Sequence, residues 1–414
     1  LHLDAAFSGL SRDIPADFAE RLRTATFTAF RRLLDLCERE SPDFLLLAGD
    51  VYNQEDASVS AQLALRDGFR RLESLSIPVF LVHGNHDPLA SRLRSVRWPG
   101  NVTVFGELPD AVPVFRKGEG TPLAIIHGAS HASGRETRNL AALFRRTEAC
   151  GLHVGLLHAT PGDADGVARY APFSQGDLKA SGMDYWALGH IHDRREVCRE
   201  PLAAYPGCTQ GLHINEPGEK GCLLVTAEAR PDGGYAVRTS FRPLGPAVWK
   251  TLDMDLGGAA SLDELENRLR TGLDRAAAEV WSGCEMLLVR LRLQGRTELD
   301  GLLRKGTTCA ELADRLREDG SGVPRIWIKD IDVATRPCVE RGALLEREDL
   351  LGEVFRLSEA ARTASGLQAL REGPLAPLFA HARAGKALEP LTDEELARLL
   401  DDAESLCLDL LEND

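Results

Sequence analysis

Residues 78–87 read PVFLVHGNHD, a short apolar run that leads into an asparagine, a histidine and an aspartate. Residues 44–50 have the same design, FLLLAGD, in which the apolar run stops at a glycine and an aspartate. Both runs have the length and composition of strands buried within a parallel sheet. Because sites in open α/β sheets form beyond the carboxyl ends of such strands, these polar residues are candidate site residues.

The first half of the chain alternates such runs with helical patterns. Three more apolar runs are LAIIHGAS (123–130), HVGLLHAT (153–160) and YWALGHIH (185–192). Helical spacing of apolar residues is found in FAERLRTATFTAFRRLLDLCE (18–38) and SAQLALRDGFRRLESL (60–75). Strands that alternate with helices predict an α/β layered core.

Three domains fit the rest of the pattern. The stretch FRPLGPAVWK (241–250), with two prolines and a glycine, interrupts the pattern and marks a first boundary. Beyond it a βαβαβ pattern is predicted, and after Glu340 only helical patterns remain. The expected domains are residues 1–245, a small α+β unit at 246–337, and an acidic helical segment at 338–414.

Composition narrows the class of protein. The formal charge of -14 argues against a broad basic surface for nucleic acid, although residues 340–414 alone hold 17 acidic and 8 basic residues. Residues 1–339 are therefore closer to neutral, and the overall charge does not exclude a local basic groove there. No apolar run approaches the roughly 18 residues of a membrane span. Nine cysteines without a CxxC pair indicate reduced thiols and, together with the missing membrane span, a cytoplasmic protein.

Five strand-end residues have side chains of metal-ligand type: Asp50, Asn85, His158, His190 and His192. Each alone has an ordinary explanation, because GD and NHD are common tripeptides and a lone histidine is usually packed. Together they indicate a dinuclear site, and mixed oxygen and imidazole ligands suit manganese, magnesium, iron or zinc. On an extended strand His190 and His192 would share a face; if the chain turns at Gly189, they can serve two ions.

The series AGD, GNHD, LLH and ALGHIH resembles the calcineurin-like metallophosphoesterases. LHLD (1–4), DYWALGHIHDRREV (184–197) and YPGCTQGLHINEPGEKGCLLV (205–225) resemble the SbcD-like DNA repair exonucleases, in their YhaO-like branch. The resemblance covers the chain to about residue 336. It implies a layered metallophosphoesterase β-sandwich flanked by helices, and a capping domain that selects DNA.

The resemblance also assigns roles at the site. His2, Asp50 and His192 would bind one ion with an aspartate expected directly before Leu1. Asp50 would bridge to a second ion held by three further ligands, Asn85, His158 and His190.

His86 would be catalytic and not a ligand, donating a hydrogen bond or proton to the phosphate and leaving oxygen. Asp87 is a candidate partner for its ring. Archaeal and eukaryotic relatives have a histidine where this chain has Asn53, so a substrate-positioning role of that histidine does not carry over.

By this resemblance the protein is a manganese-dependent DNA exonuclease or endonuclease that works with an SbcC-like ATPase in DNA repair. The sequence leaves open whether the protein forms a homodimer. Two alternatives remain: a phosphodiesterase or phosphatase for small phosphoesters, and a non-catalytic scaffold. The C-terminal helices, with Leu396, Leu399 and Leu400 on an apolar stripe, either dock the ATPase or fold back on the capping unit.

Overall fold

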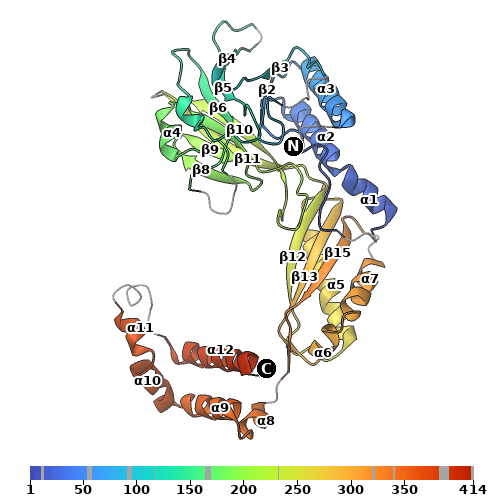
Figure 1. Ribbon diagram of the computed structural model, residues 1–414, viewed down its shortest axis with the longest axis vertical. Coiled ribbons are helices and arrows are strands. Elements are labelled where there is room, and N and C mark those ends of the chain that lie inside the picture. Colours follow the sequence, from blue (N-terminus) through green and yellow to red (C-terminus); the bar gives the residue numbers. More distant parts are fainter. Residues whose placement is uncertain are drawn as a thin grey trace. The chain divides into compact units, whose positions relative to one another are not determined.

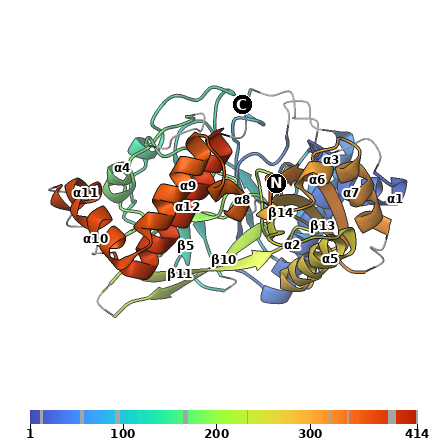
Figure 2. The ribbon, with the colours of Figure 1, turned by 90° about the horizontal axis from the view of Figure 1, so that it is seen from below.

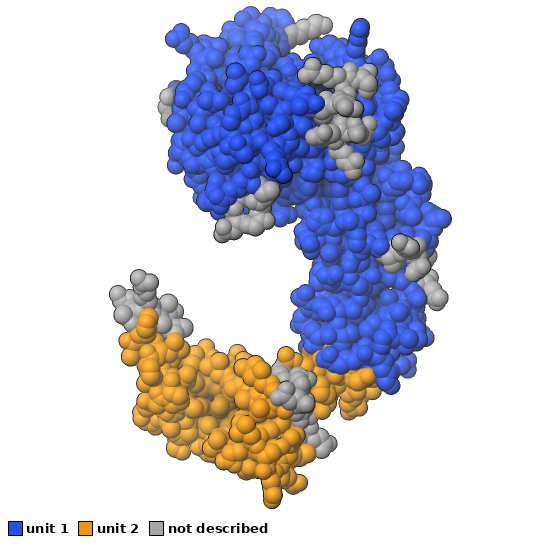
Figure 3. Space-filling model, viewed as in Figure 1, with its two compact units in different colours: residues 1–255, 262–294, 302–334 blue, residues 256–261, 295–301, 335–414 orange. Residues whose placement is uncertain are grey.

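The computed structural model places most of the chain (Figure 1). It describes residues 1–10, 14–53, 58–90, 96–116, 118–163, 169–231, 233–318, 322–338, 341–381 and 391–411. These divide into two compact units (Figure 3). Unit 1 comprises residues 1–255, 262–294 and 302–334, and unit 2 comprises residues 256–261, 295–301 and 335–414.

Two sheets form the core of unit 1. The three-stranded sheet is parallel and has the order β1 (Leu45–Ala48), β2 (Val79–Val82), β3 (Val102–Val104). The six-stranded sheet has the order β4 (Asp110–Val114), β5 (Ala124–Ala129), β6 (Leu152–His158), β7 (Tyr185–Gly189), β9 (Leu202–Tyr205), β8 (Arg195–Arg199). Its four central strands are parallel and its two edge strands antiparallel. Strands β1 and β2 contact β5, β6 and β7, so the sheets pack face to face.

Helices cover the outer faces of this sandwich (Figure 1). They are α2 (Ala25–Glu40), α3 (Val59–Ser74), α4 (Gln175–Ala180) and a 3₁₀ turn (Ala141–Leu143), whereas α1 (Ala16–Arg23) precedes α2 and packs elsewhere. The helical pattern predicted over 18–38 is thus two helices that meet at Thr24.

Strand β2 shows why the sequence selects this layering. Successive side chains of a strand point to opposite faces. Phe80 and Val82 pack in the cluster shared with the six-stranded sheet, whereas Val79 and Leu81 pack against α2 and α3. All four are buried, which is why VFLV is apolar throughout instead of alternating.

A hairpin and a second small sheet complete unit 1 (Figures 1 and 2). The hairpin pairs β10 (Gly221–Ala229) with β11 (Tyr235–Pro243). The parallel sheet has the order β12 (Ala247–Asp255), β13 (Met286–Gln294), β15 (Arg325–Val333), with α5 (Leu262–Glu279) and α7 (Thr308–Glu318) as crossover helices. Phe18 and Leu22 of α1 pack in the same apolar cluster as Trp249 and Trp327 of this sheet. The predicted βαβαβ pattern is confirmed.

Unit 2 is mainly helical. Its elements include β14 (Arg296–Thr297), β16 (Arg336–Pro337), α8 (Arg341–Leu345), α9 (Leu350–Ala361), α10 (Ala364–Glu372), α11 (Ala376–Ala380) and α12 (Asp393–Leu411), and α6 (Asp300–Leu303) spans its junction with unit 1. A capping box begins α12, because Glu395 N–H donates to Thr392 Oγ1 at 3.2 Å and Thr392 N–H donates to Glu395 Oε2 at 2.7 Å. Helix α12 packs on α9 and α10, with Leu396 and Leu408 buried.

The predicted fold class is confirmed: sheets flanked by helices, a small parallel sheet with its crossover helices, and a helical C-terminal segment. Several short strands, among them β3, β4 and β8, were not predicted from the sequence. Among the described residues, none of the helices combines the length and the apolar character needed to cross a bilayer.

Candidate metal centre

The seven site residues predicted from the sequence lie at one edge of the sandwich. His2 is in the N-terminal segment, Asp50 follows β1, and Asn85 and His86 follow β2; His158 ends β6, and His190 and His192 follow β7. The backbone joins these segments, because His2 N–H donates to Asp50 O at 3.0 Å and Ala159 N–H donates to Gly189 O at 3.2 Å.

Glycines allow these strand ends to approach one another. A Cβ on Gly189 would lie 1.8 Å from the carbonyl oxygen of Ala48, and one on Gly84 would lie 2.3 Å from Oδ1 of Asp50. Real Cβ atoms do not approach other atoms so closely. The glycines in AGD, GNHD and GHIH are therefore a requirement of the close packing around the site.

The backbone is strained at the candidate ligands. Among the described residues, His2 (φ 47°), Asp50 (φ 48°) and His190 (φ 102°) are three of the six non-glycine residues with positive φ. Such conformations cost on the order of 1–3 kcal/mol each and collect at functional sites. The surrounding sandwich therefore holds these three side chains in place against a local preference.

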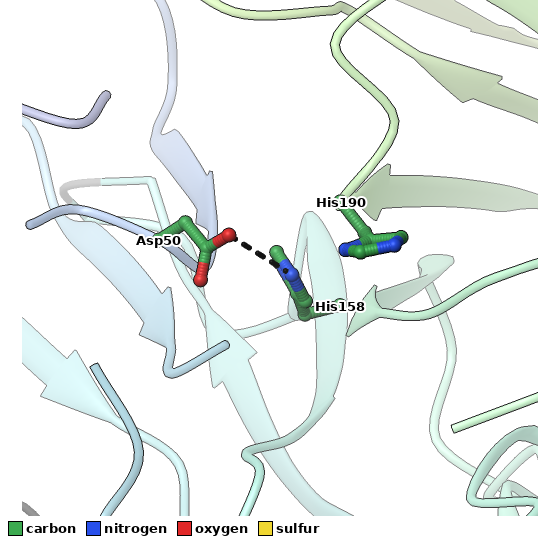
Figure 4. A group of neighbouring side chains, drawn as sticks. All are labelled: Asp50, His158 and His190. Carbon is green, nitrogen blue, oxygen red and sulfur yellow. Dashed lines mark ion pairs between the residues drawn. The ribbon is translucent and has the colours of Figure 1, made fainter. Parts of the chain in front are cut away.

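One group of candidate ligands surrounds His158 (Figure 4). The ligand atoms of Asp50, His158 and His190 all lie within 4.8 Å of one another. Nε2 of His158 is 3.3 Å from Asp50 Oδ2 and 3.0 Å from Asn85 Oδ1. The rings of His158 and His190 pack edge to face with centroids 5.2 Å apart.

A second group of candidate ligands also lies near Asp50 Oδ2. Nε2 of His2 is 3.8 Å from Asp50 Oδ2 and 3.1 Å from Nε2 of His192. His190 therefore joins the group around His158, while His192 joins His2. Strand β7 ends at Gly189 and the chain turns at His190, so the two histidines of GHIH do not lie side by side but in different groups.

Hydrogen bonds to His158 and His192 leave one nitrogen of each ring available to bind a cation. Nδ1 of His158 lies 2.8 Å from the carbonyl of Ala48, and Nδ1 of His192 lies 2.6 Å from Oε1 of Glu216. Nδ1 must donate in each case, so Nε2 of a neutral ring is a bare acceptor. These nitrogens face the Asp50 carboxylate, the Asn85 carbonyl and the His2 ring. Acceptors that converge at about 3 Å have the spacing of neighbouring ligands on one ion.

In the metal-free protein, a proton on His158 can occupy the place of the cation. Burial opposes charge on both partners, but Asp50 raises the pKa of His158, and His158 holds the pKa of Asp50 well below its usual value. A divalent ion would take over the role of that proton.

His86 is placed differently from the candidate ligands. Its side chain is exposed, and its Nδ1 lies 2.9 Å from the carbonyl of Asn53, which therefore accepts the ring proton. Its backbone N–H donates to Asp50 Oδ1 at 3.0 Å. Nδ1 thus carries the proton in the neutral ring, which leaves Nε2 as an acceptor.

Asp87 does not partner the His86 ring as the sequence suggested. It is fully buried and accepts the backbone N–H groups of Gly84 at 2.8 Å, Val51 at 2.9 Å and Asp50 at 3.2 Å. Asp87 therefore ties the loop after β1 to the loop after β2, and the partner of His86 is a main-chain carbonyl.

Sequence reasoning missed the contacts behind these side chains. His131 is fully buried, and its Nε2 lies 2.6 Å from the carbonyl of His158. Glu216 is buried behind His192; burial would raise its pKa, but the hydrogen bonds from His192 and Leu212 lower it to about 2. For Glu216, the only signal in the sequence was that it lies within the quoted segment 205–225.

The structure also brings His192, Cys208 and Glu216 within 4.8 Å of one another through their ligand atoms. Burial raises the pKa of the Cys208 thiol to about 12. Within this group, Oε1 of Glu216 accepts the hydrogen bond of His192 Nδ1–H at 2.6 Å.

Comparison with known proteins gives matches along most of the chain. The sequence pattern of calcineurin-like phosphoesterases matches residues 2–194, and that of the middle domain of metallophosphoesterase YhaO matches residues 249–336. An uncharacterized metallophosphoesterase YhaO of Bacillus subtilis is 33% identical over 380 residues, covering 91% of this chain and 89% of that protein.

More distant relatives are named as repair proteins. The DNA double-strand break repair protein Mre11 of Aeropyrum pernix is 27% identical over 290 residues, covering 63% of this chain and 64% of the relative. The protein of the same name from Haloferax volcanii is 24% identical over 355 residues, covering 80% of this chain and 72% of the relative.

Proposed function

This chain belongs to the calcineurin-like metallophosphoesterases, in the YhaO family, and from this premise we propose that it is a manganese-dependent DNA exonuclease or endonuclease of the cytoplasm. Phosphoester hydrolysis follows from the family, whereas DNA as substrate and manganese as metal are the proposal. The observation that carries it is that Oδ2 of Asp50 is close to both groups of acceptors, the one around His158 and the one around His2.

We assign the metal ligands by these groups. His2, Asp50 and His192 would hold one ion, and Asp50, Asn85, His158 and His190 would hold the other. Two divalent ions bridged in this way supply Lewis-acid stabilisation of the phosphate and an activated water. Mixed carboxylate, amide and imidazole ligands suit manganese, as they also suit magnesium, iron or zinc, and manganese is the metal we propose.

His86 is the proposed catalytic residue. Its Nδ1–H is held by the carbonyl of Asn53, which leaves Nε2 on the exposed side of the ring for the substrate. From there it would hydrogen-bond a phosphate oxygen or pass a proton to the leaving oxygen. The presence of this histidine beside the six candidate ligands disfavours a non-catalytic scaffold.

DNA as the substrate class is supported by the relatives named as double-strand break repair proteins. We propose that residues 246–337 form the capping domain that selects DNA. Its helices carry five arginines, but four of them form ion pairs with acidic neighbours: Arg268 with Glu264, Arg270 and Arg315 with Glu266, and Arg317 with Asp314. Paired arginines contribute little long-range attraction, so this chain alone should bind DNA weakly.

A partner would supply the missing affinity, and we propose an SbcC-like ATPase. Residues 338–414 offer a surface for it: Leu399, Leu406 and Leu410 of α12 follow helical spacing and are 46%, 58% and 66% exposed. An amphipathic helix with such a stripe can dock in a groove of a partner. The acidic surroundings favour a partner whose facing side is basic.

The test is a hydrolysis assay on full-length protein with manganese. Single-stranded DNA, double-stranded DNA and bis-p-nitrophenyl phosphate are compared, with Asp50→Asn as the inactive control. Cleavage of DNA by wild-type protein alone supports the proposal. Hydrolysis of the small diester or of phosphomonoesters with intact DNA, also in the presence of the ATPase, would instead identify an enzyme for small phosphoesters.

A further inference from the structure

The side of His192 that faces away from the candidate ions is held by a buried carboxylate. Glu216 lies in the loop between β9 and β10 and is 6% exposed. Its Oε1 lies 2.6 Å from Nδ1 of His192, and its Oε2 accepts the backbone N–H of Leu212 at 2.7 Å. The half-buried His213 is also close to this carboxylate, with its Nε2 3.2 Å from the same Oε1.

This contact determines which nitrogen of His192 is available. An ionised carboxylate only accepts hydrogen bonds, so Nδ1 of His192 must carry the proton. Nε2 then has its lone pair in the ring plane, directed at the side occupied by Nε2 of His2 at 3.1 Å. Without this acceptor either nitrogen could be protonated, and the ring could also rotate about its side-chain bonds.

The same loop also holds the backbone of His192. Lys220, 6% exposed, donates from Nζ to the carbonyl of His192 at 3.2 Å and to Oδ1 of Asp193 at 3.1 Å. The loop thus contacts both the ring and the main chain of His192. These contacts to the ring and to the main chain hold His192 in position close to His190, whose backbone is strained.

We propose that Glu216 is a positioning residue of the metal centre, which fixes the Nδ1–H tautomer of His192 and directs its Nε2 to the ion shared with His2 and Asp50. This inference rests on the two-ion site of the proposed function. A carboxylate behind an imidazole ligand also makes the ligating nitrogen more basic, and loss of such a partner typically lowers metal affinity by about 10–100-fold.

Glu216→Gln is the informative substitution. Glutamine has one acceptor oxygen where glutamate has two, so it cannot serve both His192 and Leu212. We expect one manganese ion to bind the variant with wild-type affinity and the other to bind about 10–100-fold more weakly. In electron paramagnetic resonance, the signal of a coupled manganese pair should give way to that of a single ion until excess manganese restores the pair.

His213→Gln is the matched control, because it removes the other imidazole from the same oxygen without touching His192. This variant should bind both ions like wild type. If both Glu216→Gln and His213→Gln match wild type in isothermal titration calorimetry, the inference is overturned. Binding of a third ion that is lost in both Cys208→Ala and Glu216→Gln would also overturn it, because Glu216 would then be a ligand.

The tautomer can be measured without any substitution. In metal-free wild-type protein with ¹⁵N-labelled histidine, His192 should show a protonated Nδ1 and a bare Nε2, and the reverse tautomer would overturn the inference. Wild-type protein that binds two ions but cleaves no DNA would refute the nuclease proposal and leave Glu216 to be judged by the titrations. Fewer than two ions in wild type would overturn both.

Discussion

Oδ2 of Asp50 lies 3.3 Å from Nε2 of His158 and 3.8 Å from Nε2 of His2, so one carboxylate oxygen is close to both imidazoles. One side chain is therefore within reach of both groups of candidate ligands. The φ of 48° at Asp50 and the Asp87 contact to its backbone N–H hold it there.

Asp50→Asn should abolish metal binding and hydrolysis together. The amide loses the charge that both ions would share, and activity toward bis-p-nitrophenyl phosphate should fall by at least about 100-fold. Metal content of dialysed protein is the second readout. Asp43→Asn, at a surface pair with Arg116, is the control and should keep both properties. An Asp50→Asn protein with two tightly bound ions would show that Asp50 is not the bridge.

His86→Gln should separate catalysis from metal binding. Because the ring is bound to the Asn53 carbonyl and not to the acceptor groups, both ions should remain. Loss of a general acid lowers the rate by about 10²–10⁴-fold. Metal stoichiometry and the rate constant are measured on the same sample. Loss of an ion in this variant would place His86 among the ligands.

Gly189→Ala should damage the site through packing alone. The added methyl group would meet the carbonyl oxygen of Ala48 at 1.8 Å, and overpacking in a core typically costs about 1–3 kcal/mol. We expect a lower free energy of unfolding in urea and weaker metal binding. Gly106→Ala is the matched control, since its Cβ would meet nothing within 4 Å. Equal stability and metal affinity in the two variants would contradict the close approach of β1 and β7.

The buried His127 should make the protein less stable in mild acid. Burial lowers the pKa of His127 to about 4, and its Nε2 lies 2.9 Å from Nδ1 of His153. The unfolded chain takes up the proton near pH 6.5, before the folded protein does, so stability falls as the pH drops from 6.5 toward 4.

For this one group the loss is at most about 2 kcal/mol between pH 6.5 and 5. His127→Gln, whose amide can still donate to His153, should flatten that part of the profile measured by urea unfolding. A variant profile with the same slope as wild type would show that His127 titrates normally.

The exposed leucines of α12 should affect binding of the partner ATPase but not hydrolysis. Leu406→Glu combined with Leu410→Glu should reduce co-purification with the SbcC-like ATPase and leave hydrolysis of the small diester unchanged. Leu63→Glu, on α3 in unit 1, is a control of comparable chemistry at a leucine that is 37% exposed. Undiminished partner binding by the α12 variant would remove this surface from consideration.

Five of the six candidate ligands could be anticipated from the sequence because each follows or ends an apolar strand, and parallel strands bring their carboxyl ends together; His2 came only from the family resemblance. The divergence of His190 and His192 could only be stated as one of two arrangements, since it depends on the backbone turn at His190.

The support for His86 and His192 could not be anticipated. Asn53 acts through its carbonyl, which every residue has, and Glu216 lies in a loop whose path no periodicity reveals. The strand β3 was missed for a related reason: three half-buried residues are too few to show a pattern.

A crystal structure of the full-length protein soaked with manganese would show whether Asp50 bridges two metal ions. Anomalous scattering locates each ion independently of the protein atoms. We expect two peaks next to Asp50, one against His2 and His192 and the other against Asn85, His158 and His190. A single peak, or peaks that do not touch Asp50, would contradict this bridging role.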